Sequence, residues 1–231
     1  MENVFENNGI ILTEEKRAKL NEFSAFLREY NEKVNLTAIV EPAEVEKKHF
    51  LDSLMGMDYF PQNAKVVEIG SGGGFPSVPL KIAREDLRFT QVESVGKKCK
   101  FLEETAQKFA FSNHTVINAR AEDLGKNKAY RETFDCVTAR AVANLSTLSE
   151  YCLPLVKVGG VFVCYKGNCQ QAEEEATQAK NALFILGGKI EKTVKYTLPG
   201  GDERTIFLIK KVKPTPEKYP RGNGKERSKP L

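Results

Sequence analysis

Tryptophan is absent from this sequence of 231 residues, and histidine occurs only twice. Five cysteines are present, but no two of them have the Cys-x-x-Cys spacing of a zinc site or a redox motif. Most of the cysteines stand in apolar stretches, as Cys136 and Cys164 do, which favours buried free thiols over disulfides. We therefore expect no metal site, and a reducing, cytoplasmic environment suits the chain.

Long apolar runs are also missing. No stretch approaches the roughly 20 residues of a transmembrane helix, and the first residues lack the basic segment and apolar core of a secretory leader. Hydrophobic residues make up 41% of the chain and charged residues 29%, as in an ordinary globular protein of one large domain or two small ones. The net charge of +4 is mild, and because no dimerisation motif is evident we expect a monomer.

The first sixty residues are expected to form helices. Thr13 is a suitable N-cap, because Glu14 and Glu15 follow it in the turn where the helix dipole favours acids. Apolar residues then recur at steps of three and four, namely Leu20, Phe23, Leu27, Tyr30 and Val34. Pro42 predicts the start of a second helix, over residues 43–57.

From residue 65 onward, short strands alternate with helices. The expected strands are mostly apolar, as in a sheet covered on both faces, and lie at 65–69, 88–93, 114–118, 134–139 and 160–165. Helices are expected near 76–85, 96–110, 146–157 and 170–186. Two more strands, 188–197 and 204–211, are joined by a linker too short for a helix, so they must form an antiparallel hairpin.

Five strands in β-α alternation and a closing hairpin predict an α/β fold with a mostly parallel, doubly wound sheet. Their number and order resemble the Rossmann-like, seven-stranded methyltransferase sheet, here with an N-terminal helical extension. We expect one domain over residues 1–212, made of the extension (1–60) and the core (61–212). Residues 213–231 hold four prolines, six basic and two acidic residues, and are expected to be a basic, flexible tail.

A glycine-rich loop, residues 70–74, follows the first strand of the core. Glycine permits positive φ and a close approach of the backbone to a ligand, and the helix that follows offers free N–H groups. Ligands of open α/β sheets bind at the carboxyl ends of the strands. Glu68 precedes the loop, where a carboxylate can receive a cationic amino group through water, and Glu93 ends the next strand, where it can accept both hydroxyls of an adenosine ribose.

The loop does not match two other nucleotide-binding motifs. A nicotinamide fingerprint has the pattern G-x-G-x-x-G/A, and Phe75 is too large for its last position. The pattern G-x-x-x-x-G-K-[ST] of ATPases does not occur. A surface turn with two solvated glutamates is the alternative, but strand, loop, helix and second acidic strand end coincide. The pattern favours an adenosyl ligand held without a pyrophosphate clamp.

Seven segments resemble the bacterial glucose-inhibited division protein B family of small-subunit ribosomal RNA guanine-N7 methyltransferases. They are Asn35-Leu36-Thr37, His49-Phe50-Leu51-Asp52-Ser53, Glu68 to Pro76, Glu93 to Lys98, Arg120-Ala121-Glu122, Ala139 to Ala143 and Lys218 to Arg221. The match covers nearly the whole chain up to the tail. Family members mostly have aspartate where Glu68 and Glu93 stand, so the charge is kept on a longer side chain.

The loop and the resemblance together give the expected site. The expected cofactor-binding residues are Glu68, Gly70, Gly72, Gly74, Phe75, Glu93, Ser94, Ala121, Glu122 and Arg140. The resemblance implies that Arg140 also lies near the reaction centre, and a salt bridge to Glu68 or Glu93 is the alternative. The expected RNA-binding residues are Lys97, Lys98, Lys166, His49 and Arg221. The alternatives are a solvated helix face for the lysines and, for His49, a hydrogen-bond cluster with Asp52 and Ser53.

The resemblance implies that S-adenosylmethionine donates a methyl group to N7 of a guanine in 16S ribosomal RNA, either naked or in the small ribosomal subunit. Because N7 carries a lone pair and no proton, it can attack in line with the departing sulfur, and no general base is expected. Alignment and electrostatics would then carry the catalysis. A methyltransferase for another RNA position, a protein or a small molecule, and a non-enzymatic RNA-binding module, remain alternatives.

Overall fold

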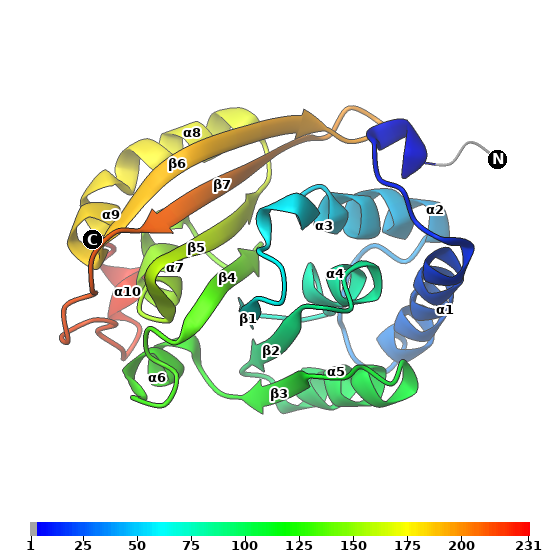
Figure 1. The fold of residues 1–231 in the computed structure, drawn as a ribbon, viewed down its shortest axis with the longest axis horizontal. Coiled ribbons are helices and arrows are strands. Elements are labelled where there is room, and N and C mark those ends of the chain that lie inside the picture. Colours follow the sequence, from blue (N-terminus) through cyan, green and yellow to red (C-terminus); the bar gives the residue numbers. More distant parts are fainter. Residues whose placement is uncertain (1–3) are drawn as a thin grey trace.

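A sheet of seven strands forms the centre of the structure, a computed structural model that describes residues 4–231 (Figure 1). The first three residues of the expected N-terminal extension therefore lie outside the described part. The strands are β1 (Lys65–Ile69), β2 (Arg88–Glu93), β3 (His114–Asn118), β4 (Phe134–Arg140), β5 (Val156–Lys166), β6 (Gly188–Thr197) and β7 (Glu203–Lys211). All seven lie where the sequence predicts them, although β5 begins four residues earlier than expected.

The strand order is β3-β2-β1-β4-β5-β7-β6. Strands β1 to β5 are parallel, and β7 runs antiparallel between β5 and β6, which confirms the predicted hairpin and fold class. The order reverses between β1 and β4, two neighbouring strands of the sheet. In sheets of this kind the ligand crevice lies at such a reversal, outside the carboxyl ends of the strands.

The helices of the described chain cover both faces of the sheet. They are η1 (Glu6–Asn8), α1 (Glu14–Asn31), α2 (Pro42–Val45), η2 (Glu46–Leu51), α3 (Asp52–Leu54), η3 (Met57–Tyr59), α4 (Ser77–Ala83), α5 (Gly96–Lys108), α6 (Ala121–Lys126), α7 (Leu145–Cys152), α8 (Cys169–Gln178), α9 (Lys180–Leu186) and α10 (Lys225–Ser228). None of them within residues 4–231 is both long and apolar enough to cross a bilayer. The helix expected over 170–186 is two helices, which meet at the buried Ala179.

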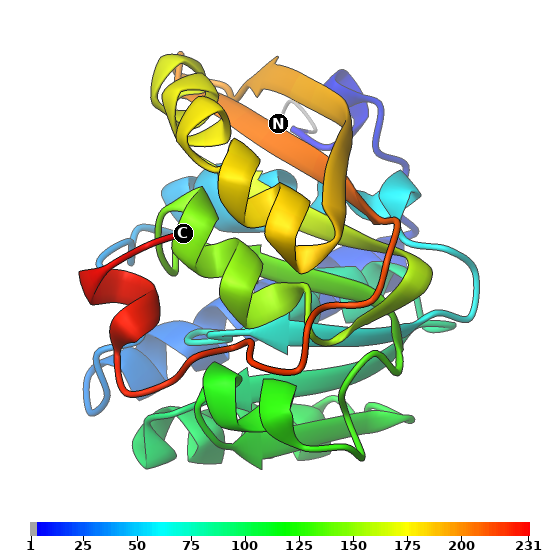
Figure 2. The same cartoon turned by 90° about the vertical axis from the view of Figure 1, so that its left-hand side faces the viewer.

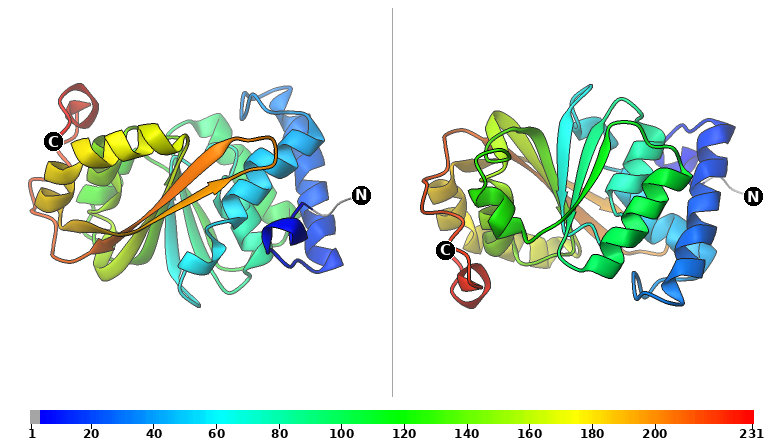
Figure 3. Two further views of the ribbon diagram at one scale, coloured as in Figure 1. Left: turned by 90° about the horizontal axis from the view of Figure 1, so that it is seen from above. Right: turned by 90° about the horizontal axis from the view of Figure 1, so that it is seen from below.

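Two apolar clusters hold these layers together. The first joins α1, α4 and α5 to one face of the sheet, and the second joins α6 to α9 to the other (Figure 3). Neighbouring residues of one strand serve opposite clusters, as Val66 and Val67 do, because successive side chains of a strand point to opposite faces. Thr13 caps α1 as predicted, since its hydroxyl accepts a hydrogen bond from the amide of Lys16.

The second N-terminal helical segment, residues 42–54, is α-helical at its ends and π-helical over η2. A π turn widens the helix by one residue and often occurs at functional sites. Here the π turn ends directly before Asp52 and contains His49, and both side chains are buried. These two residues belong to the site described below.

The sequence predicts a flexible tail over residues 213–231, whereas the structure packs this segment along α6 and α7 and ends it in α10 (Figure 2). Tyr219 is buried in the second apolar cluster. The Arg131 guanidinium donates hydrogen bonds to the carbonyl groups of Thr215 (2.7 Å) and Tyr219 (2.8 Å). A few buried groups thus hold a segment that has no apolar periodicity.

Candidate active site

The glycine loop lies between β1 and α4, at the reversal of the strand order. Gly70, Gly72 and Gly74 have φ values of 71°, 53° and 83°, which favour glycine. A Cβ atom on Gly70 would lie 2.7 Å from Val142, and one on Gly74 would lie 2.6 Å from Val78. At Gly72 the nearest atom would be 3.8 Å away, so this glycine faces open space. Gly70 and Gly74 permit close packing, and Gly72 leaves room for a ligand.

Glu93 holds the loop from the end of β2. One carboxylate oxygen accepts a hydrogen bond from the Gly72 amide (3.0 Å) and the other accepts one from the Val95 amide (2.9 Å). The neighbouring Ser94 is exposed. Glu93 therefore stands at the strand end where the sequence predicts a ribose-binding carboxylate.

A cavity of about 80 Å³ opens beside the loop, and we call it the glycine-loop cleft. It is lined by Ile69, Gly70, Val92, Glu93, Ser94, Ala119, Arg120, Ala121, Glu122, Val142, Tyr151 and Arg227. Five of the ten predicted cofactor-binding residues are among them: Gly70, Glu93, Ser94, Ala121 and Glu122. Apolar side chains such as Val92 and Val142, next to a carboxylate at one strand end, fit a flat base and a ribose, and the open space at Gly72 fits a ligand in contact with the loop.

Glu68 does not line this cleft. Its side chain is fully buried below the loop, and its carboxylate accepts hydrogen bonds from the Ser77 amide (3.1 Å) and the Ser77 hydroxyl. Burial raises the pKa of Glu68 to about 7, although the hydrogen bonds from Ser77 and Ser71 oppose this shift. The expected water-mediated contact with a ligand amine is therefore replaced by a contact that joins the loop to α4.

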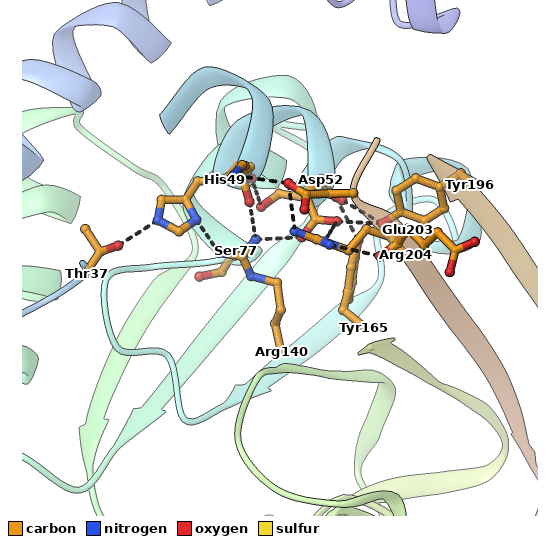
Figure 4. Close-up of polar contacts among 12 residues, drawn as sticks. Thr37, His49, Asp52, Ser77, Arg140, Tyr165, Tyr196, Glu203 and Arg204 are labelled. Atoms are coloured by element: carbon orange, nitrogen blue, oxygen red, sulfur yellow. Dashed lines mark hydrogen bonds and ion pairs between the residues drawn. The ribbon is translucent and has the colours of Figure 1, made fainter. Parts of the chain in front are cut away.

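Arg140 reaches away from the cleft into a second group of polar residues (Figure 4). Its guanidinium donates hydrogen bonds to Asp52 Oδ2 (2.7 Å), to the Lys48 carbonyl (3.0 Å) and to His49 Nδ1 (2.9 Å). The sequence offered a salt bridge from Arg140 to Glu68 or Glu93 as an alternative. Arg140 does form a salt bridge, but its partner is Asp52, so the predicted partners are wrong. Asp52 is 88 residues away in the chain, so no local pattern indicated the pair.

His49 is a neutral hydrogen-bond partner in this group. Burial and the charge of Arg140 lower its pKa to about 3. Nδ1 therefore accepts from Arg140, and Nε2 carries the proton and donates to the Thr37 hydroxyl at 2.8 Å. The imidazole also stacks on the Phe75 ring, with 4.3 Å between the centroids. Both ring nitrogens are occupied, so His49 has no nitrogen left to take a proton from a substrate.

Asp52 joins this group to the terminal hairpin. Its Oδ1 atom accepts a hydrogen bond from the Tyr196 hydroxyl (2.7 Å) and lies 3.6 Å from Arg204 Nε. Asp52 and Arg204 border a cavity of about 350 Å³, which we call the arginine pocket. It is lined by Ile39, Lys48, His49, Asp52, Arg140, Ala141, Tyr165, Lys166, Gly167 and Arg204.

The cleft and the pocket meet at residues 140–142, directly after β4. Arg140 and Ala141 line the arginine pocket, and Val142 lines the glycine-loop cleft. Ala141 has a φ of 57°, a left-handed conformation that costs a non-glycine residue free energy and often occurs at functional sites. Consecutive residues of this short segment thus belong to the linings of both cavities.

The structure places the predicted RNA-binding residues in three settings. Lys97 is exposed and Lys98 half-buried at the start of α5, while His49 lies inside the arginine pocket. Lys166 also lines the pocket, and its ammonium pairs with Glu175 at 2.6 Å. Arg221 pairs with the buried Glu150 at 2.7 Å, so it anchors the C-terminal segment.

Several site residues were not expected from the sequence. Tyr196 and Arg204 come from the terminal hairpin, and Tyr151 and Arg227 come from α7 and α10. Phe75 was expected beside the cofactor, but it supports the arginine pocket, since the Arg140 guanidinium lies 5.1 Å from its ring centroid. Only a tertiary contact brings these residues to the site. No spacing in the sequence indicates them.

Solved structures of methyltransferases share the fold. An O-methyltransferase from Bacillus cereus in complex with SAH covers 82% of this chain with a TM-score of 0.56 and 16% identity, and the match spans 91% of that chain. TYW2 of M. jannaschii in complex with AdoMet covers 70% with a TM-score of 0.54 and 15% identity, over 77% of that chain. The likeness shows the Rossmann-like methyltransferase fold, in which the glycine loop lies at the reversal point of the sheet.

Sequence comparisons specify the family. The family model described as rRNA small subunit methyltransferase G matches residues 16–206. The ribosomal RNA small subunit methyltransferase G of Lactobacillus helveticus is 48% identical over 229 residues, which cover 97% of this chain and 95% of that protein. Its counterpart from Pelotomaculum thermopropionicum is 45% identical over 226 residues, or 96% and 94%. The chain belongs to the rRNA small subunit methyltransferase G family, which confirms the resemblance and the prediction of a methyltransferase.

Proposed function

We propose that this protein transfers a methyl group from S-adenosylmethionine to N7 of a guanine in small-subunit (16S) ribosomal RNA. The observation that carries this proposal is the meeting of the glycine-loop cleft and the arginine pocket at residues 140–142. The relatives named above supply the substrate, since they act on small-subunit ribosomal RNA according to their names. One cavity is assigned to the cofactor and the other to the base.

The glycine-loop cleft holds the cofactor in this proposal. Gly70, Gly72 and Gly74 shape the loop against the methionine part, and Glu93 and Ser94 receive the ribose. Ala121 and Glu122 border the adenine. The open space at Gly72 and the Glu93 carboxylate at the strand end support these roles. Glu68 and Phe75 act from below, by holding the loop and the arginine pocket in place.

The arginine pocket receives the guanine. Guanine presents the acceptor O6 beside N7, and guanidinium and ammonium groups are the side chains that most often bind this edge. Arg140, Arg204 and Lys166 offer such donors around the pocket. The three hydrogen bonds of Arg140 to Lys48, His49 and Asp52 fix its position, so it acts as a positioning residue for the base.

The absence of a free base in the pocket agrees with attack by N7. When bound, S-adenosylmethionine supplies a methyl group on a positively charged sulfur. The N7 lone pair attacks this methyl group in line with the departing sulfur. N7 has no proton to lose, and His49 has no free nitrogen to accept one. The residues of the site therefore align and exclude water, and they transfer no proton.

RNA contacts extend beyond the pocket in this proposal. Lys97 and Lys98 lie at the start of α5, next to the cleft residue Ser94, where they can bind phosphates. The enzyme acts as a monomer in the cytoplasm, where small ribosomal subunits are available. Residues 1–212 act as one catalytic domain, and the basic segment 213–231 is attached to it.

Transfer of labelled methyl from S-adenosylmethionine to purified small ribosomal subunits and to naked 16S RNA, followed by nucleoside analysis, tests this function. We expect labelled 7-methylguanosine. Label in another nucleoside would contradict the choice of N7, and label in protein would contradict the RNA substrate. Cofactor binding without any transfer to RNA would still agree with a cofactor in the glycine-loop cleft, but it would contradict a guanine in the arginine pocket.

A further inference from the structure

The C-terminal segment 221–231 crosses α7 and is fixed there by buried groups (Figure 2). The Arg221 guanidinium binds both carboxylate oxygens of Glu150, at 2.9 Å and 2.7 Å, and Glu150 is 1% exposed. The Thr147 hydroxyl donates a hydrogen bond to the Glu226 carbonyl at 2.7 Å. Glu226 is itself fully buried, and its carboxylate accepts a hydrogen bond from the Gly222 amide. These contacts give α10 a fixed place on α7.

This placement brings Arg227 to the glycine-loop cleft. Arg227 and Tyr151 line the cleft together with Ala121 and Glu122, and Arg227 Nε donates a hydrogen bond to the Tyr151 hydroxyl at 3.3 Å. Arg227 is exposed, and apart from this contact its guanidinium makes no hydrogen bond or ion pair that holds it within the described chain. A charged side chain is thus directed to the cleft by a helix whose neighbouring residue, Glu226, is buried.

The chemistry of the side chain indicates what it binds. A guanidinium is planar, stacks on aromatic faces and donates hydrogen bonds in its plane. Adenine presents a flat face and ring nitrogens that accept hydrogen bonds. We propose that Arg227 is a cofactor-binding residue that covers the adenine, so that the C-terminal segment forms one wall of the adenine subsite. This inference rests on the proposed assignment of the cleft to S-adenosylmethionine, and it adds a residue that the methyl transfer itself does not require.

Calorimetric titration of the full-length protein with S-adenosylhomocysteine tests this inference. We expect Arg227→Ala to raise the Kd about fivefold, a typical loss for an exposed cation–π contact. Lys225→Ala is the matched control, because Lys225 is an exposed cation in the same helix that does not line the cleft, and its Kd should stay within twofold of wild type. Arg227→Lys should stay weakened, because an ammonium keeps the charge without the flat face.

A second ligand locates the contact within the cofactor. 5′-Methylthioadenosine contains the adenosine but lacks the amino acid, and Arg227→Ala should weaken it by the same factor as S-adenosylhomocysteine. An unchanged Kd in Arg227→Ala, an equal loss in Lys225→Ala, full recovery in Arg227→Lys, or a loss confined to S-adenosylhomocysteine would each overturn the proposal. If the wild-type protein binds S-adenosylhomocysteine but transfers no methyl group to RNA, the proposed function is contradicted, whereas the role of Arg227 in cofactor binding is not.

Discussion

The two cavities at the reversal of the sheet are built in different ways. The glycine-loop cleft lies beside a local backbone feature, a loop with three glycines at positive φ that one carboxylate holds by accepting from two amides. The arginine pocket is made of side chains from distant segments, in which Arg140 contacts the π turn before α3 and Asp52 contacts the terminal hairpin. The first cavity depends on the backbone conformation of one loop, and the second depends on a network of paired charges.

This difference has energetic consequences. The glycine loop keeps its shape as long as its glycines hold their positive φ values, and its open space lies at Gly72. A buried charge network behaves otherwise: removing one partner leaves the other charged and unpaired, which costs about 3–5 kcal/mol. Asp52, with 5% of its side chain exposed, would be left as a buried carboxylate without this ion pair if Arg140 were removed. Four variants test the comparison, beginning with the largest expected effect.

Replacing Arg140 by lysine should abolish most of the methyl transfer. Lysine keeps the charge but cannot hold Asp52, His49 and the Lys48 carbonyl at once, so the base loses its alignment, and we expect turnover to fall about 100-fold. The Kd for S-adenosylhomocysteine should change less than about threefold, because the cleft is shaped elsewhere. Arg84→Lys is the control, since Arg84 pairs with Asp86 at 2.7 Å and lines neither cavity. A loss of cofactor affinity equal to the loss of turnover would contradict the division into two sites.

Replacing Gly72 by valine should have the opposite signature. Its side chain would occupy the open space at the loop, and we expect the cofactor Kd to rise at least about tenfold in calorimetry. Gly159→Val separates this effect from strain, because Gly159 also has a positive φ of 86° and open space but lies far along the chain in β5. Both variants should lose similar thermal stability. Unchanged affinity in Gly72→Val would remove the loop from the binding site.

Replacing Glu68 by glutamine should change the pH dependence of stability. The folded-state pKa of Glu68 is raised from 4.5 to about 7, so its stabilising contribution is present below pH 4.5 and is lost as the pH rises through 7. Glutamine imitates the protonated carboxyl at every pH. Urea unfolding should therefore give equal free energies for both proteins at pH 4.5, and at pH 8 the variant should be more stable by about 1 kcal/mol or more. Equal stability at pH 8 as well would mean that the buried carboxylate ionises without cost.

The smallest effect is expected at the RNA surface. Lys97→Ala should weaken RNA binding two- to threefold and lower the slope of log Kd against log salt by about 0.7–0.9, as for one lost phosphate contact. Lys100→Ala is the matched control in the same helix, since Lys100 is exposed and lies 3.8 Å from Glu104. The same loss of slope in both variants would indicate a diffuse attraction, and no loss in either would leave this helix outside the RNA interface.

The strands and the glycine loop can be predicted from the sequence, whereas the arginine pocket cannot. The strands were located within a few residues because parallel strands are short apolar runs, and the Thr13 cap followed from a local rule. The glycine loop was equally local. The arginine pocket was not, because Arg140 and Asp52 are 88 residues apart and Tyr196 is 144 residues from Asp52. Pairing over such distances depends on the folded sheet.

Two further differences have the same origin. Glu68 has the sequence context of a ligand-binding carboxylate, but the turn into α4 directs it to Ser77. The basic segment after residue 212 lacks apolar periodicity, yet Arg221 finds the buried Glu150, 71 residues earlier in the chain. In both cases the partner decides the role of the charged group, and the partner is visible only in the tertiary structure.

The most direct test of the two-site account is a crystal structure of the protein with S-adenosylhomocysteine and an RNA oligonucleotide that contains the target guanine. The account predicts the adenosine in the glycine-loop cleft, the guanine in the arginine pocket, and N7 directed at the sulfur across residues 140–142. A guanine bound outside the arginine pocket, or a cofactor that contacts Arg140 and Asp52 in place of the glycine loop, would contradict it.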